Sequence, residues 1–291
     1  MAAADSTGVT TGKVAVGDGT LIHYQHYRQA SSSQCVVLVH SLALDHRFWR
    51  LVAPAIAARA HVVCVDVRGH GQSGKPPGPY SIELFAQDVK EVLQALGYRK
   101  AVVAGASLGG CVALQFAIDH PEMTAALGLV DTTSWYGPTA PDDWSKRAQK
   151  AKTDGLDSMV QFQATRWFSE QFRTDQPELL RQCVDTFLAN DVEAYGEACR
   201  ALGRFNASTR VAQVSAPTAV VVGANDYAAP VAMSRYLHES IQGSTLTIIP
   251  EACHLTPIET PDVIVNTLER LLEGLDAQQG QAAAQTQGDP E

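Results

Sequence analysis

Positive charge and long apolar runs are what this chain lacks most. Its 22 lysines and arginines are outnumbered by 31 aspartates and glutamates, which gives a formal net charge of −9. The basic footprint of a nucleic-acid-binding protein is therefore missing. No apolar run approaches the length of a transmembrane helix, and residues 1–12 carry neither the cationic nor the apolar part of a secretory signal. We expect a protein without nucleic-acid or membrane partners.

Paired cysteine motifs are also missing from this chain. The six cysteines include no C-x-x-C pair and mostly stand in apolar runs. A disulfide framework is thus not indicated, and the thiols are predicted to be reduced core residues of a cytoplasmic protein. No pattern in the sequence requires a metal or another cofactor, so we expect none.

Alternating strand and helix patterns dominate the 291 residues, of which 45% are hydrophobic and 18% charged. A hairpin is predicted around the Asp-Gly turn at 18–19, because this dipeptide stands between two apolar runs. Six further strands are predicted from apolar runs at 35–40, 61–66, 102–106, 125–130, 218–223 and 244–249. Strands that alternate with helices indicate an α/β fold built on a mostly parallel, doubly wound, eight-stranded sheet.

The pattern changes between residues 132 and 212, where aromatic residues and helical spacing replace the strand-like runs. We interpret 132–212 as an inserted helical cap of about four helices, and 13–131 with 213–273 as the core. Residues 1–12 are predicted to be a flexible N-terminus. Residues 274–291 are rich in Gln, Ala and Gly and are predicted to be a disordered tail.

The segment Gly105-Ala106-Ser107-Leu108-Gly109 stands between a predicted buried strand and a predicted helix. This G-x-S-x-G pattern is typical of a nucleophile elbow, in which the serine occupies a strained turn and a Cβ two residues away does not fit. The N–H groups at the start of the following helix point to the position where an oxyanion would form. Ser107 is therefore the candidate nucleophile, with a chance glycine-rich turn as the alternative.

A serine hydroxyl needs a neighbouring base, and the base needs an acid that orients its ring. In doubly wound sheets the site lies at the carboxyl ends of the strands, so polar residues that follow strands are the candidates. His254 follows the last strand and comes after Ser107 in the chain order Ser…Asp…His. Asp226 is the preferred acid and Asp131 the alternative, since both come after strands.

Two backbone N–H groups are expected to form the oxyanion hole. One is predicted to come from Leu108, the residue after the nucleophile. The other is predicted to come from Leu42 or Ser41, in the loop that follows the 35–40 strand. Both groups belong to the backbone, so the geometry of these loops matters more than the identity of their side chains.

A second polar loop carries Asp66, Arg68 and His70 among glycines. These side chains could belong to the site, because the loop follows a strand. We favour the other interpretation, a buried hydrogen-bond network that holds the loop next to the elbow.

Taken together, these motifs resemble the α/β-hydrolase fold superfamily over residues 14–273. The resemblance rests on Asp66-Val-Arg-Gly-His-Gly-Gln-Ser73, the elbow at 105–110, the segment from Gly223 to Pro230, and His254. It implies a triad of Ser107, Asp226 and His254. Members with an aspartate nucleophile, such as haloalkane dehalogenases and epoxide hydrolases, are disfavoured because position 107 is a serine.

Within the superfamily, the chain resembles the 3-oxoadipate enol-lactonases. The similar stretches lie at 41–49 and 76–83 and, in the cap, at 166–168 and 195–202, whereas His40 and Ala43 depart from the family pattern. The resemblance implies a cofactor-free serine esterase that opens 3-oxoadipate enol-lactone, in the β-ketoadipate pathway of aromatic compound degradation. This substrate carries a carboxylate, for which Arg166 is the candidate partner, with Trp167 as an apolar wall.

Other functions stay open at this point. On the same scaffold the chain could be a general carboxylesterase, a perhydrolase-like enzyme or a hydrolase of C–C bonds. A non-catalytic ligand receptor could also keep the fold, but it would not need a serine, an aspartate and a histidine together. Nothing in the sequence predicts the oligomeric state.

Overall fold

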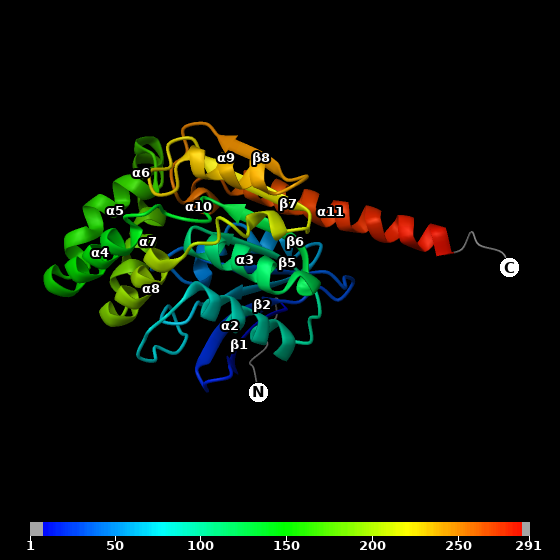
Figure 1. Cartoon of the computed structure of the whole chain (residues 1–291), viewed down its shortest axis with the longest axis horizontal. Helices are drawn as coiled ribbons and strands as arrows, with labels where there is room; N and C mark the ends of the chain where they lie inside the picture. The colour runs from blue at the N-terminus through cyan, green and yellow to red at the C-terminus, as the bar shows by residue number, and fades with distance from the viewer. Residues whose placement is uncertain (1–7, 287–291) are drawn as a thin grey trace.

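The computed structural model describes residues 8–286 and has an eight-stranded sheet at its centre (Figure 1). The strand order is β1-β2-β4-β3-β5-β6-β7-β8, and only β2 runs against the other strands. The strands are β1 (Val9–Ala15), β2 (Leu21–Tyr27), β3 (Cys35–Val39), β4 (His61–Val65), β5 (Ala101–Ala106), β6 (Thr124–Val130), β7 (Thr218–Gly223) and β8 (Thr245–Ile249). The predicted mostly parallel, doubly wound, eight-stranded sheet is confirmed.

Helices cover both faces of this sheet. Helices α2, α3 and α9 pack on one face and α1 and α11 on the other. These core helices and the short α10 are α1 (Ala53–Ile56), α2 (Ile82–Ala95), α3 (Leu108–Asp119), α9 (Val231–Ser240), α10 (Thr256–Glu259) and α11 (Pro261–Thr286). Because β5 lies in the middle of the sheet and all of its residues are buried, the strand and the helix α3 that follows it form the buried centre of the fold.

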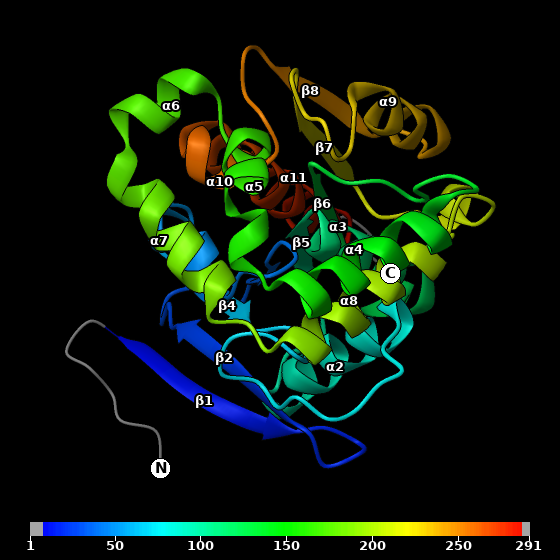
Figure 2. The same cartoon turned by 90° about the vertical axis from the view of Figure 1, so that its left-hand side faces the viewer.

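Five helices are inserted between β6 and β7, and Figure 2 shows them in front of the sheet. They are α4 (Ala140–Asp154), α5 (Val160–Trp167), α6 (Glu170–Asp175), α7 (Pro177–Leu188) and α8 (Val192–Arg204). The insertion leaves and re-enters the core at one point, where Trp135 and Asn206 form an isolated bridge. The side chains of Ser169 and Asp191 cap α6 and α8, which explains why the insertion is divided into short helices.

The two ends of the chain differ from the sequence prediction. Residues 9–12, predicted to be flexible, pair with β2 as part of β1, because the edge of the sheet offers backbone partners that the sequence alone does not show. Helix α11 continues to Thr286, so 274–286 is helical where a disordered tail was predicted from residue 274. Its alanine and glutamine content favours helix although it lacks an apolar face. The rest of both predicted segments, 1–7 and 287–291, lies outside the described residues.

The apolar residues Phe48, Val52 and Ile56 have a helical spacing but do not lie on one continuous helix. The structure has a 3-10 helix over His46–Trp49 and then the four-residue helix α1, which begins with Pro54 in its first turn. All six cysteines are free and buried, as predicted for core residues. Among the described helices, none combines the length and the apolarity needed to span a membrane.

Candidate active site

Ser107 stands at the turn between β5 and α3 with φ 55° and ψ −116°. A non-glycine residue adopts this conformation only under strain. The two flanking glycines are needed because other chain segments come close to them. A Cβ on Gly105 would lie 2.0 Å from the carbonyl oxygen of Gly109, and a Cβ on Gly109 would lie 2.1 Å from that of Val39. These close contacts fix the conformation of the turn and place the serine hydroxyl at the end of the central strand.

The structure brings together the three residues of the predicted triad from three different loops. Nε2 of His254 lies 2.9 Å from Oγ of Ser107, and Nδ1 of His254 lies 2.8 Å from Oδ2 of Asp226. The other carboxylate oxygen of Asp226 accepts the backbone N–H groups of Ala228 and Ala229 at 2.8 and 2.9 Å. This chain of contacts holds the imidazole with a proton on Nδ1 and leaves Nε2 free to accept the proton of the serine.

The electrostatics around His254 suit a base that becomes a cation during the reaction. Burial alone would lower the pKa of His254, but the charge of Asp226 and the hydrogen bond to it outweigh burial and raise the pKa above its ordinary value of 6.5. Arg147 opposes this shift, because its positive charge is close enough to be felt by the ring. The pKa of His254 is thus raised by Asp226 of the core and lowered by Arg147 of the cap.

Asp131, the alternative acid, makes a different set of contacts. Its Oδ1 accepts the N–H of Gly223 at 3.1 Å, and its Oδ2 accepts the N–H and the hydroxyl of Thr256 at 3.0 and 2.7 Å. Burial and the nearby charge of Asp226 raise the pKa of Asp131 well above its ordinary value. Asp131 joins the end of β7 to the start of α10 and makes no hydrogen bond to His254.

The loop after β3 is oriented by a buried histidine. His40 accepts the N–H of Val67 on Nε2 at 2.9 Å and donates from Nδ1 to the carbonyl oxygen of Ser41 at 2.8 Å. The same carbonyl accepts the N–H of Leu44 at 3.2 Å. In a trans peptide the carbonyl and the next N–H point in opposite directions, so fixing the Ser41 carbonyl also fixes the N–H of Leu42. Ser41 and Leu42 both line the cavity that contains Ser107.

This cavity has a volume of about 790 Å³ and lies between the core and the cap. Ser107 and His254 line it from the core, and the two predicted cap residues, Arg166 and Trp167, line it from α5.

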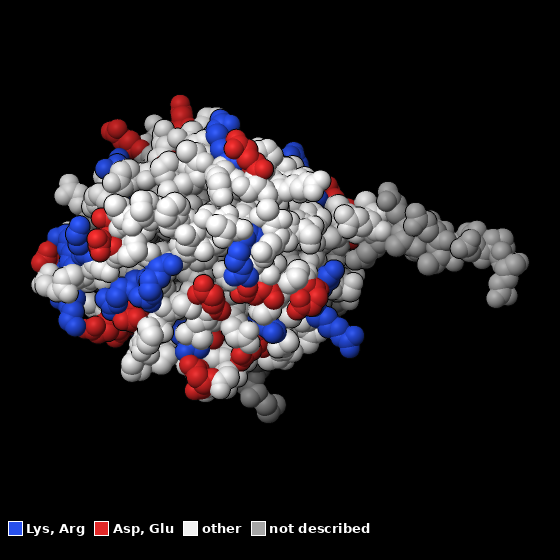
Figure 3. All heavy atoms as spheres, viewed as in Figure 1, with Lys and Arg blue, Asp and Glu red and all other residues white. Residues whose placement is uncertain are grey.

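The cap side of the cavity is rich in positive charge. Three further basic side chains of α4 reach it, namely Lys146, Arg147 and Lys150, whereas Asp143 is its one acidic lining residue. Figure 3 shows Lys and Arg side chains gathered at the cap end of the molecule, although the chain as a whole is acidic.

Arg147 is a lining residue with distinctive contacts that the sequence analysis did not single out. Its guanidinium lies 5.5 Å from the centre of the Trp144 ring, and its Nε donates to the hydroxyl of Tyr195 at 2.7 Å. Among residues 8–286, no carboxylate forms an ion pair with it. Only the run of basic residues at 146–152 on one predicted helix hinted at its role, and this run gave no sign of which member points inward.

Arg166 is placed less deeply than we expected for a partner of a buried carboxylate. Its side chain is exposed, and its guanidinium lies 4.1 Å from the centre of the Tyr227 ring and 5.3 Å from that of Phe162. No acidic partner is found for it within the described part of the chain. Arg166 therefore stands at the edge of the cavity, where the cap meets the loop that carries Asp226. Trp167 is buried and forms a wall of the cavity, as predicted.

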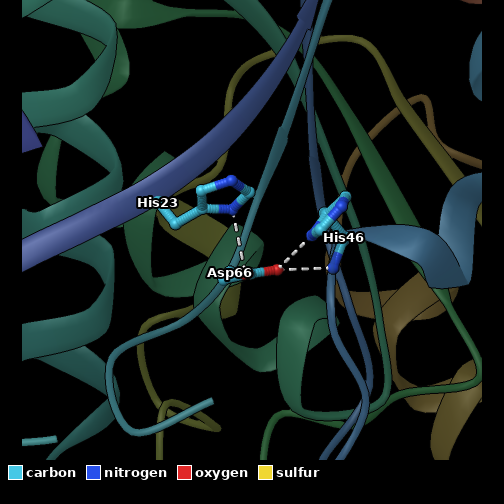
Figure 4. Close-up of side chains that lie close together, drawn as sticks. All are labelled: His23, His46 and Asp66. Atoms are coloured by element: carbon cyan, nitrogen blue, oxygen red, sulfur yellow. Dashed lines mark hydrogen bonds and ion pairs between the residues drawn. The ribbon is translucent and has the colours of Figure 1, made fainter. Parts of the chain in front are cut away.

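The loop with Asp66, Arg68 and His70 lies outside the lining of this cavity. Oδ1 of Asp66 accepts the backbone N–H and the ring Nδ1–H of His46 at 2.6 and 2.8 Å (Figure 4). Oδ2 accepts the N–H of Gln72 at 2.8 Å and lies 2.9 Å from Nδ1 of His23. The three side chains are close enough to one another to hold a metal ion. The backbone N–H groups of His46 and Gln72 each occupy one oxygen of the Asp66 carboxylate.

Arg68 completes this network on the other side of the loop. It binds both oxygens of Asp88 at 2.9 and 2.8 Å and also contacts Asp18 in the β1–β2 turn. The ring of His70 donates to the carbonyl oxygen of Arg68 at 3.1 Å. These contacts support the interpretation of a buried network that holds the loop in place.

Comparison with known proteins agrees with this fold and site. Residues 34–261 match the family model described as alpha/beta hydrolase fold. Among curated proteins, the chain is 30% identical to 3-oxoadipate enol-lactonase 2 of Acinetobacter baylyi, over 87% of this chain and 93% of that protein. It is 27% identical to 3-oxoadipate enol-lactonase 1 of the same organism, over 84% and 90% of the two chains.

Solved structures give the same answer. The enol-lactonase of Burkholderia xenovorans superposes with a TM-score of 0.86 at 29% identity, over 90% of this chain and all of that one. An esterase of Thermogutta terrifontis, solved with malate bound, superposes with a TM-score of 0.84 at 25% identity, over 91% and 98% of the two chains. The chain therefore belongs to the alpha/beta hydrolase family and is an ester- or lactone-hydrolysing enzyme similar to the enol-lactonases.

Proposed function

We propose that this enzyme hydrolyses 3-oxoadipate enol-lactone through an acyl-enzyme on Ser107. The observation that carries the proposal is the guanidinium of Arg147, which lines the same cavity as Ser107 and His254 and has no carboxylate partner among residues 8–286. A half-buried cation of this kind is poorly solvated until an anion joins it. A lactone with a carboxylate arm supplies that anion together with the bond to be cleaved, and the named activity of the enol-lactonase relatives supports this choice.

The reaction begins when Oγ of Ser107 attacks the lactone carbonyl and Nε2 of His254 takes the hydroxyl proton. The resulting imidazolium is stabilised by Asp226 through the bond to Nδ1. Collapse of the tetrahedral intermediate breaks the bond between the acyl carbon and the ring oxygen, and the imidazolium returns the proton to that leaving enol oxygen. Water, activated by His254, then attacks the acyl-enzyme and releases the open acid and the free serine.

Two N–H groups are proposed to hold the negative oxygen of the intermediate. Leu108 is the first residue of α3, so its N–H has no acceptor within the helix and carries the positive end of the helix dipole. The second donor is the N–H of Leu42, in preference to that of Ser41, because the Ser41 carbonyl is fixed by two donors. Pre-oriented donors of this kind contribute about 3–4 kcal/mol each to transition-state stabilisation.

Substrate binding is divided between the core and the cap. Arg147 is proposed to bind the carboxylate arm, and the hydroxyl of Tyr195 accepts the Nε–H of this guanidinium and holds it in position. Trp167 would pack against the apolar part of the lactone. Arg166, exposed at the edge of the cavity, is proposed to attract the anion during entry and to contribute less to its final binding.

A second candidate is a general carboxylesterase, which the size of the cavity favours. A volume of about 790 Å³ lies in the upper part of the range of roughly 300–1,000 Å³ that holds drug-sized ligands, so acyl groups larger than a six-carbon lactone also fit. An esterase of this kind would hydrolyse neutral p-nitrophenyl esters of increasing acyl length as well as it hydrolyses the anionic lactone.

The proposal is tested by following the loss of the ultraviolet absorbance of the enol-lactone with purified protein. We expect a much higher kcat/KM for this lactone than for neutral p-nitrophenyl esters or for vinylogous diketones, which are substrates of C–C hydrolases. An equal or higher kcat/KM for neutral esters would instead identify the enzyme as a general carboxylesterase. Turnover of the lactone would also place the enzyme in the β-ketoadipate pathway of aromatic compound degradation.

A further inference from the structure

One carboxylate outside the triad bridges the loop of the catalytic histidine and the cap. Glu259 is the last residue of α10, five residues after His254. Its Oε2 accepts the backbone N–H of Cys253 at 2.8 Å, and its Oε1 accepts the backbone N–H of Ser169 at 2.9 Å. Cys253 directly precedes the base, and Ser169 caps the cap helix α6. A single side chain thus joins two backbone segments that are 84 residues apart in sequence.

A second bond between the same two segments runs in parallel. The N–H of Leu255, the residue after the base, donates to the carbonyl oxygen of Trp167 at 3.1 Å. Both neighbours of His254 are therefore attached to the junction of α5 and α6, Cys253 through Glu259 and Leu255 directly. The same junction supplies the Trp167 wall of the cavity.

The side chain of Glu259 is held by backbone groups and not by an ion pair. Within residues 8–286, no lysine, arginine or histidine forms an ion pair with this carboxylate, which is half-buried and is held by the two N–H groups. An ionised acceptor makes stronger bonds to N–H groups than a neutral one. The two oxygens of one carboxylate thus fix two backbone positions.

We propose that Glu259 is a positioning residue, which holds the ring of His254 against Ser107 and couples its position to that of the cap. The inference rests on the proposed serine mechanism and adds a residue to it. The contact of 2.9 Å between Nε2 of His254 and Oγ of Ser107 depends on the backbone from 253 to 255, which Glu259 and Trp167 hold. A displacement of about 1 Å at a reacting group can lower a rate about 100-fold.

The first test is Glu259→Gln, which keeps the shape of the side chain. A glutamine offers one acceptor oxygen and an NH2 group, so it can accept only one of the two N–H groups and presents a donor to the other. We expect kcat to fall about 10- to 100-fold, with KM for a small neutral ester changed by less than about threefold. The rate of labelling of Ser107 by a small fluorophosphonate should fall by the same factor as kcat.

Glu91→Gln is the matched control. Glu91 on α2 also accepts a backbone N–H from a distant loop, that of Gly17 at 2.7 Å, and it lies outside the lining of the catalytic cavity. Its replacement makes the same chemical change elsewhere in the fold, and we expect kcat and the labelling rate to stay at the wild-type values. Thermal unfolding of both variants separates a loss of rate from a loss of folded protein.

The coupling to the cap is tested at Ser169, whose φ of −60° suits proline. Ser169→Pro removes the N–H that binds Glu259, whereas Ser169→Ala removes only the hydroxyl that caps α6. We expect the proline variant to be labelled several-fold more slowly than the alanine variant, although Ser169 does not line the cavity. Equal labelling rates for this pair would overturn the coupling.

Failure of this inference differs from failure of the proposed mechanism. A wild-type protein that is not labelled at Ser107 and does not turn over any ester would overturn the mechanism. A wild-type protein that is labelled, together with a folded Glu259→Gln variant that is labelled at the same rate, would overturn the role of Glu259 alone. A rise in KM without a fall in the labelling rate would also overturn it, because the residue would then act only on the cap.

Discussion

The two walls of the catalytic cavity are built in different ways. On the core side, hydrogen bonds of 2.8–2.9 Å hold Ser107, Asp226 and His254 in place. Close backbone contacts at Gly105 and Gly109, which leave no room for a Cβ, also fix the turn that carries Ser107. On the cap side, Arg147 and Arg166 lie against aromatic rings and a hydroxyl and have no carboxylate partner among the described residues. We therefore expect the core to determine which bond is broken and the cap to determine which molecule is bound.

The largest expected effect is on the core side. Ser107→Ala or His254→Ala should each lower kcat by about 10⁴-fold or more, because the nucleophile or its base is lost while the fold is kept. Single-turnover kinetics with the enol-lactone would measure this loss. Near-normal activity of Ser107→Ala would mean that the core does not supply the nucleophile, and the division between the two walls would then be wrong.

A comparison of the two aspartates tests the core side more finely. Asp226→Asn should lower kcat by about 10⁴-fold, because the amide holds the imidazole in the wrong tautomer. Asp131→Asn should leave kcat within about tenfold of the wild type and instead lower the free energy of unfolding by about 1–3 kcal/mol, because its bonds join β7 to α10. Urea unfolding and steady-state kinetics on both variants measure the two effects. Loss of activity in Asp131→Asn alone would reverse the assignment of the acid.

The cap side is expected to respond through binding. Arg147→Met should raise KM for the anionic lactone about 10- to 100-fold, equivalent to about 1.5–3 kcal/mol for a hydrogen bond to a charged group, with kcat for a neutral ester unchanged. Arg166→Met, the control on the same wall, should raise KM by less than about fivefold, because the residue is exposed and screened by solvent. A larger rise in KM for Arg166→Met than for Arg147→Met would show that Arg166 binds the substrate carboxylate, as the sequence predicted.

The smallest expected effect is a shift in pH dependence that connects the two walls. His254 must be neutral to accept a proton, so kcat/KM should fall as the pH falls through its pKa, with a midpoint above 6.5 because Asp226 raises that pKa. Arg147 lowers it, so Arg147→Met should move the midpoint of the profile to higher pH. The measurement is kcat/KM for a neutral ester from pH 5 to 9. A midpoint that does not move would show that the charge of Arg147 does not affect the pKa of His254.

The candidate residues of the core side could be named from the sequence because their positions follow from topology. Ser107, Asp226 and His254 each follow a strand of a parallel sheet, and the carboxyl ends of such strands meet at one edge. The choice between Leu42 and Ser41 could not be made from the sequence, since it depends on the orientation of one peptide plane. That orientation is set by His40, a residue noted in the sequence only as a departure from the family pattern.

The cap was predicted less completely because helical spacing does not show which side of a helix faces a cavity. Lys146, Arg147 and Lys150 all stand in one helix, and Arg147 is distinguished only by its contacts with Trp144 and Tyr195 and by the ion pairs that the two lysines form instead. The Glu259 bridge was invisible for a similar reason, since it joins backbone groups of two distant segments. Contacts between elements therefore limited the prediction more than the elements themselves did.

The six buried cysteines have a practical consequence. Burial raises the pKa of each thiol, so little thiolate is present at neutral pH and alkylating reagents find no ready target. An enzyme of this kind should be inactivated by serine-directed reagents and spared by thiol-directed ones. One cysteine introduced on the exposed surface of α6, for example at Gln171, could then carry a fluorophore in an otherwise native chain and report directly on movement of the cap.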